Sequence, residues 1–214
     1  MGLIKKQAGF DLESKMRKWC EDNNIKQYNL TKDYMLDTTS SVYLINELEP
    51  LKYKLGECDF LSFNRCEVKD LSTFPDKINC LSITNTNINI NEILTRCTIY
   101  KIFITSQDNL VLKFGKGGIH LPLVLYLDYC DNVTIYIHST GDDYEPYISM
   151  NHCTNVNIYV VNYYGDLTLS NNIFNNIIIQ NSKFKTLTFN NNNERFNIKY
   201  LQDHGNTWNI LKNP

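Results

Sequence analysis

The sequence predicts a mainly β protein: a β-solenoid of about seven coils of ~20 residues behind a small N-terminal helical cap. Three observations lead to this prediction. Alternating apolar residues, typical of half-buried strands, occur many times after Cys58. These alternating segments return at intervals of 19 to 23 residues. The chain is rich in Asn but still 43% hydrophobic, and a solenoid can use inward Asn side chains to satisfy backbone groups.

Each predicted coil opens on two apolar residues spaced two apart: Leu61/Phe63, Leu81/Ile83, Ile102/Ile104, Leu125/Leu127, Ile148/Met150, Leu167/Leu169 and Leu187/Phe189. Five positions into the coil stands a small or hydrogen-bonding side chain: Cys66, Thr86, Gln107, Cys130, Cys153, Asn172 and Asn192. Ten positions in, five coils start a second apolar run, at Leu71, Leu112, Ile135, Ile158 and Ile177. A two-strand coil of this length cannot bury its own apolar face, so we expect the coils to stack on one continuous core.

The seventh position of the coil is more varied: Val68, Ile88, Asn109, Asn132, Asn155, Phe174 and Glu194. The best copies, LYLDYCDNVTI and ISMNHCTNVNI, share the pattern L-x-L-x-x-C-x-N-x-x-I. We expect Cys and Asn at these bends to point inward and bond turn backbone, with Asn155 as an inward ladder residue. The second coil is a weak copy because Asn91 occupies an apolar position.

Both ends of the chain predict caps. Apolar residues fall at helical spacing near the N-terminus: Leu12, Met16, Trp19 and Cys20. This spacing predicts an amphipathic helix over residues 11–22, closed by Asn23 and Asn24. Short alternating segments, YNL and SVYLI, follow it, and Trp208, Ile210 and Leu211 predict a cap at the other end. We therefore expect one structural domain with three parts: a helix and capping segment (1–57), a repeat solenoid (58–201) and a C-terminal cap or tail (202–214).

Charge and cysteine usage limit the classes of partner. The formal net charge is -2 and only 21% of residues are charged, so no global field attracts nucleic acid or membranes. The start of the chain lacks an apolar segment of signal-peptide length, and no stretch approaches the ~18 to 20 apolar residues of a membrane span. Seven cysteines without CxxC pairs favour reduced, buried thiols. We expect a cytoplasmic protein.

The stretch from Trp19 to Pro75 resembles a known family. WCEDNNIKQYNL, then SVYLI, then PLKYKLGECDFLSFNRCEVKDLSTFP are similar to the leucine-rich-repeat-like proteins of tailed bacteriophages, which open with a W-x-x-x-N-x-I-x-x-Y cap. The match covers roughly a quarter of the chain, and the LP signature of that family survives only as Phe74-Pro75. The resemblance implies a leucine-rich-repeat-like solenoid and a phage protein acting in the host cytoplasm. It implies no activity.

The sequence gives no support for a metal, a cofactor or catalysis. The four histidines, His120, His138, His152 and His204, do not share a metal-ligand spacing. His152 adjoins Cys153, but the repeat turns Cys153 inward and His152 outward. Glycan-cleaving solenoids use clustered carboxylates, whereas Asp128 is the only carboxylate expected on the outward face of the first strands. We expect a non-catalytic protein without cofactor or metal. A cleft lined with two carboxylates within ~10 Å of each other would instead favour the hypothesis of a carbohydrate-active enzyme.

Two outward surfaces are candidate partner sites. The first groups Phe103, Tyr126 and Tyr129 with Asp128, Asn151 and His152, and aromatic residues with polar neighbours are typical of interaction hot spots. Its structural alternative is that such residues simply suit exposed strands. The second places Tyr136, Tyr159 and Ile178 in one outward column, as a homodimer seam, a partner site or a surface covered by a loop. The leading hypothesis is a module that binds and blocks a host protein.

The alternative is a local RNA- or single-stranded-DNA-binding module that uses Lys113, Lys116, Lys183 and Lys185 with exposed tyrosines. Aromatic stacking beside lysines suits single strands, and such binding would weaken steeply with added salt. The lysines at 113 and 116 lie in the insertion KFGKGGIHL, and a second insertion, STGDDYEP, follows at 139–146. Their opposite charges predict that these loops pair.

Overall fold

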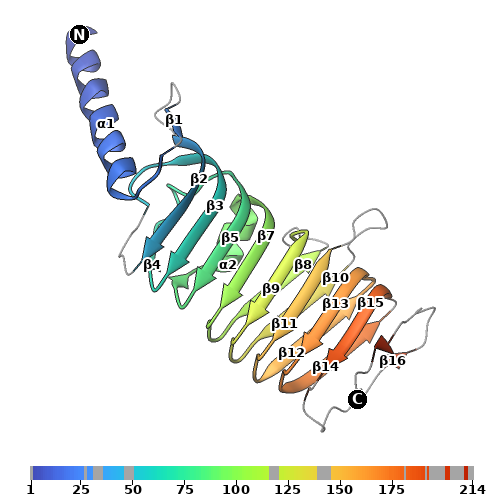
Figure 1. The fold of residues 1–214 in the computed structure, drawn as a ribbon. Coiled ribbons are helices and arrows are strands. Elements are labelled where there is room, and N and C mark those ends of the chain that lie inside the picture. The colour runs from blue at the N-terminus through green and yellow to red at the C-terminus, as the bar shows by residue number, and fades with distance from the viewer. Residues whose placement is uncertain are drawn as a thin grey trace.

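The computed structural model shows an elongated stack of coils with α1 (Gly2–Asp22) at its N-terminal end (Figure 1). Two long sheets of mainly parallel strands run along the stack, and a third sheet of two short parallel strands lies in its first coils, so the prediction of a β-solenoid is confirmed. The structure describes residues 2–26, 28–30, 36–45, 51–115, 121–138, 146–180, 182–190, 192, 201–202 and 210–211. No helix among these is long and apolar enough to cross a membrane.

The first sheet takes one strand from each coil, and its neighbours pair in parallel except where β1 runs antiparallel to β2. Its strands are, in order, β1 (Tyr28–Leu30), β2 (Leu36–Ile45), β3 (Leu55–Asn64), β5 (Lys77–Thr84), β7 (Thr98–Thr105), β9 (Val124–Asp128), β11 (Tyr147–Asn151), β13 (Tyr164–Ser170), β15 (Lys183–Asn190) and β17 (Ile210–Leu211). The first parallel strand, β2, thus lies within the segment 1–57.

The second sheet is shorter and forms only in the later coils. Its strands are β8 (Val111–Gly115), β10 (Thr134–His138), β12 (Val156–Val161), β14 (Phe174–Gln180) and β16 (Leu201–Gln202). The first coil returns through β4 (Glu67–Val68) and a turn, so Leu71 is buried as expected but does not start a strand. The second sheet therefore begins only at the third coil.

The second coil returns through β6 (Asn87–Ile88) and α2 (Ile90–Arg96). Its buried residues Ile90, Ile93 and Leu94 follow the helical rather than the strand period, which explains why this copy of the repeat is weak. Asn91 therefore does not occupy a core position. It lies on the helix, and its Nδ2 donates to the Val111 carbonyl at 2.6 Å.

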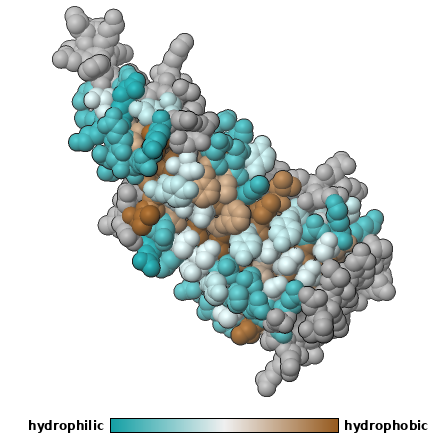
Figure 2. All heavy atoms as spheres, viewed as in Figure 1, coloured by the Kyte–Doolittle hydropathy of each residue, from teal (hydrophilic) through white to brown (hydrophobic). Residues whose placement is uncertain are grey.

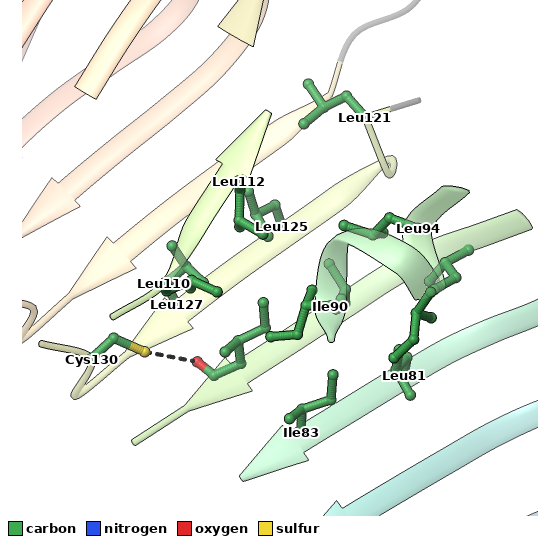
Figure 3. Packing of buried hydrophobic residues seen from close by; sticks show 14 of the residues in the cluster. Leu81, Ile83, Ile90, Leu94, Leu110, Leu112, Leu121, Leu125, Leu127 and Cys130 are labelled. Atoms are coloured by element: carbon green, nitrogen blue, oxygen red, sulfur yellow. Dashed lines mark hydrogen bonds between the residues drawn. The ribbon is translucent and has the colours of Figure 1, made fainter. Parts of the chain in front are cut away.

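The core runs along the inside of the stack, where the apolar pairs that open the coils pack against the buried residues of the returning segments. Figure 3 shows part of it, where Leu81, Ile83, Leu125 and Leu127 are among the buried side chains. Residues at the fifth position close the core at the bend, as expected: the Cys130 thiol donates to the Ile104 carbonyl at 3.7 Å (Figure 3). These side chains bond backbone from inside the stack, as Asn172 does to the Met150 carbonyl at 2.9 Å.

The seventh position does not form an inward ladder, and the expectation for Asn155 is wrong. Asn109, Asn132 and Asn155 are exposed and have φ angles of 58°, 53° and 51°. Asn tolerates this left-handed conformation better than most residues, so its role here is to turn the chain. The Asn155 side chain faces outward and its Nδ2 donates to Asp131 at 2.9 Å. Among the described residues at this position, Val68 and Phe174 are buried and both are apolar.

The ends of the stack also differ in part from expectation. The N-terminal helix begins at Gly2 rather than at residue 11, because a helix can continue beyond the turns that bury an apolar stripe. Within residues 11–22 of the helix the buried residues are Met16, Trp19 and Cys20, and Asn24 closes the helix with a φ of 55°. At the other end Ile210 and Leu211 form β17, which extends the first sheet in parallel. Trp208 lies outside the described residues.

Candidate functional site

The parallel register of the first sheet aligns outward residues of successive coils in rows. The middle row contains Tyr43, Ser62, Ser82, Phe103, Tyr126, Ser149, Thr168 and Thr188. The next row contains Ile45, Asn64, Thr84, Thr105, Asp128, Asn151, Ser170 and Asn190. Within these two rows Asp128 is the only charged residue, whereas the adjoining row of the same face also carries Lys101 and Asp166.

Aromatic residues gather at the centre of this face. The rings of Phe103 and Tyr126 are direct neighbours on β7 and β9, with centroids 5.8 Å apart. Val124 and Tyr147 pair in the adjoining row, and Tyr147 is 38% exposed. We call Phe103, Val124, Tyr126 and Tyr147 the aromatic patch. Figure 2 views the molecule from this side and shows pale and tan residues over the middle of the stack, with teal residues towards its ends.

Val124 and Tyr147 were not predicted from the sequence. The signal was present, because the outward alternation that contains Tyr126 and Ser149 continues two residues earlier in each strand. Each predicted coil begins at its apolar pair. The outward residues just N-terminal to the pair therefore fall outside the predicted coil.

The four residues that follow the patch form a second group, the Asp128 cluster: Asp128, Tyr129, Asn151 and His152. Tyr129 and His152 occupy the left-handed bend after their strands, with φ angles of 51° and 50°. This conformation turns both side chains outward, and their rings stack at 4.6 Å with an interplanar angle of 3°. The six residues predicted for the first candidate surface are thus neighbours across β7, β9 and β11.

Hydrogen bonds connect the cluster. Asn151 donates from Nδ2 to Asp128 Oδ1 at 3.3 Å, and His152 Nδ1 lies 3.5 Å from the same oxygen. Asn171 donates to Asn151 Oδ1 at 2.9 Å, which fixes the orientation of the Asn151 amide. The Asp128 side chain is 20% exposed and that of His152 41% exposed. Burial, followed by the Asp128 charge, raises the pKa of the neighbouring Tyr126 phenol, so this phenol stays protonated at neutral pH.

The second candidate surface lies on the second sheet. Lys113, Tyr136, Tyr159 and Ile178 are aligned on β8, β10, β12 and β14, and we call them the tyrosine column. The two tyrosine rings stack at 4.7 Å with an interplanar angle of 8°. Lys113 Nζ lies 5.7 Å from the centroid of the Tyr136 ring. The expected outward alignment of Tyr136, Tyr159 and Ile178 is confirmed.

The lysines of the nucleic-acid alternative are not on one surface. Lys113 belongs to the second sheet, whereas Lys183 and Lys185 belong to β15 of the first sheet. Lys116 lies outside the described residues, as do 117–120 and 139–145, so the expected pairing of the two insertions falls outside them too.

The described residues hold no group of three His, Cys, Asp or Glu side chains placed to bind a metal ion. His152 is exposed and Cys153 is fully buried, so the two face opposite ways, as expected. Cys130 and Cys153 are adjacent in the core, where the hydrogen bond with the Cys130 thiol and then burial raise the pKa of Cys153. Both thiols belong to the inward ladder of the core.

Comparison with known proteins gave no match: no family model, no curated protein and no solved structure is significantly similar to this chain.

Proposed function

We propose that this chain is a non-catalytic protein-binding module that uses the aromatic patch. The observation that carries the proposal is the Phe103–Tyr126 pair, whose half-buried rings face outward on a sheet row without charged residues. Exposed aromatic groups on a rigid surface lose little conformational entropy on binding and are frequent anchors of protein interfaces. The Asp128 cluster beside the patch provides polar neighbours of the kind found at interface rims.

The resemblance of residues 19–75 to phage proteins supports a proposal for the biological role of the chain. We infer a leucine-rich-repeat-like protein of a tailed bacteriophage, which acts in the host cytoplasm and blocks a host enzyme or defence factor. A rigid parallel sheet backed by a packed core suits inhibition by occlusion, because it can cover a broad area of the target and no loop has to become ordered on binding.

Affinity capture from nuclease-treated bacterial lysate tests this proposal. Three baits are compared: the wild-type chain, the patch variant Phe103→Ser/Tyr126→Ser and the control Tyr136→Ser/Tyr159→Ser on the tyrosine column. We expect one stoichiometric protein with the wild type and the control, and its loss with the patch variant. A protein lost only with the control would place the partner site on the tyrosine column, and the absence of any stoichiometric protein would refute the proposal.

The nucleic-acid alternative has one favourable observation, the position of Lys113 over the Tyr136 ring. However, Tyr159 stacks on Tyr136 and Lys113 covers it from the preceding strand, so the ring faces on which a base would stack are occupied. The same capture without nuclease distinguishes the two functions, because material recovered only there would be held through nucleic acid. Sedimentation of the control variant also tests whether the chain forms a homodimer through the tyrosine column. If it does, Tyr136→Ser/Tyr159→Ser should dissociate the dimer.

A further inference from the structure

Asp128 differs from six other carboxylates in the described structure. Asp11, Glu13, Asp76, Glu67, Glu57 and Glu92 each pair with a Lys or Arg. Asp128 has only His152 and the Asn151 amide near Oδ1, and no described residue donates to its Oδ2. A carboxylate that is largely withdrawn from water and has no Lys or Arg beside it gains from a positive charge brought to it.

The aromatic groups around Asp128 favour a particular shape of cation. Tyr129 is 59% exposed, and His152 covers one face of its ring. The corresponding residue of the preceding coil is Ser106, at the same left-handed bend, and its side chain is too short to cover the other face. A flat group can therefore stack on Tyr129 while it reaches the Asp128 carboxylate.

We propose that the partner protein inserts an arginine side chain at the Asp128 cluster, where its guanidinium pairs with Asp128 and stacks on Tyr129. This inference rests on the proposed function of the aromatic patch. Arginine fits better than lysine because its planar fork makes paired hydrogen bonds to a carboxylate and stacks on aromatic rings. Nonpolar parts of the same partner segment would cover Phe103 and Tyr126, which lie on the neighbouring row.

A random dodecamer peptide library, displayed and selected on the immobilised full-length chain, tests the inference. Peptides that still bind the Phe103→Ser/Tyr126→Ser variant are removed by counter-selection. We expect the remaining peptides to share an arginine at one position. The dissociation constant of the best peptide and of its Arg→Gln form is then measured against the wild type and Asp128→Asn.

Either single change should weaken binding about tenfold, which is about 1.4 kcal/mol, and the second change should add little in the presence of the first. Asp59→Asn is the control, because it removes an exposed carboxylate from β3 of the same sheet and should leave binding unchanged. Patch-dependent peptides that lack arginine, that prefer lysine or that bind Asp128→Asn normally would overturn the inference while the proposed function stands. If no peptide depends on the patch, both are refuted.

Discussion

The Asn172 side chain is hydrogen-bonded to the backbone of Cys153 in the preceding coil. Its Oδ1 accepts the Cys153 N–H at 2.9 Å and its Nδ2 donates to the Met150 carbonyl at 2.9 Å. Asn172 is 1% exposed, so no water replaces these bonds. One amide thus satisfies two backbone groups at a bend of the stack, where the strand ladder ends.

Asn172→Ala should therefore destabilise the protein strongly. The substitution leaves a buried N–H and a buried carbonyl without partners, and we expect a loss of about 2–4 kcal/mol in the free energy of unfolding. Urea unfolding followed by circular dichroism measures this loss. Asn155→Gly is the matched control: the φ of 51° suits glycine, so its stability should stay within about 0.5 kcal/mol of the wild type. Equal losses in the two variants would contradict the distinction between the fifth and seventh positions.

Asn172 and Asn155 also show where sequence reasoning reaches its limit. The repeat interval and the apolar pairs, such as Leu125/Leu127, predicted the stack and its core correctly because alternation is local to the strand. The residue type of an Asn does not reveal its φ angle, and Asn serves both as an inward hydrogen-bonding group and as a left-handed turn residue. The period alone could not separate these roles.

The same limit applies to α2 and to the candidate site. Ile90, Ile93 and Leu94 span less than two helical turns, too short for a helical period to stand out from a strand repeat. For the site, the repeat register predicted that Phe103 and Tyr126 are neighbours, since equal positions of adjacent coils must pair. The stacking of Tyr129 on His152 depends on side-chain rotation at a bend, which no repeat interval specifies.

Cys80 should be the cysteine that reacts first with iodoacetamide in the native protein. It is half-buried, whereas the other six are buried. Burial raises the pKa of Cys20 to about 11, of Cys58 to about 12 and of Cys97 to about 11, and it raises the pKa of Cys80 as well, so accessibility distinguishes Cys80 from these thiols. Mass spectrometry after brief alkylation at pH 8 should find the label on Cys80. Cys80→Ser should remove the fast phase, and a fast phase that persists would show that another thiol is accessible.

The stacked rings of Tyr136 and Tyr159 should stabilise the second sheet. A double-mutant cycle with Tyr136→Ala and Tyr159→Ala should give a coupling free energy of about 0.5–1.5 kcal/mol in urea unfolding, as for other aromatic pairs. Lys113→Met keeps the side-chain length but removes the charge above Tyr136, and should cost at most about 1 kcal/mol. A coupling near zero would show that the two rings contribute independently.

Gly115 ends β8 in a conformation that only glycine adopts readily, with a φ of 110°. A Cβ at this position would overlap the carbonyl oxygen of His138, which is main chain of the paired strand β10 and cannot rotate away. Gly115→Ala should therefore combine backbone strain with a displaced strand end, at a cost of about 2–4 kcal/mol in the free energy of unfolding.

Val111→Ala is the control for this strand, because Val111 is 42% exposed at the start of β8. Its truncation should cost less than about 1 kcal/mol, since it removes little buried surface. Urea unfolding of both variants gives the comparison. If the Gly115→Ala and Val111→Ala proteins had the same free energy of unfolding, this would contradict the close approach of β8 to the His138 carbonyl. The second sheet would then begin with a different backbone path, which would also change the direction in which Lys113 meets Tyr136.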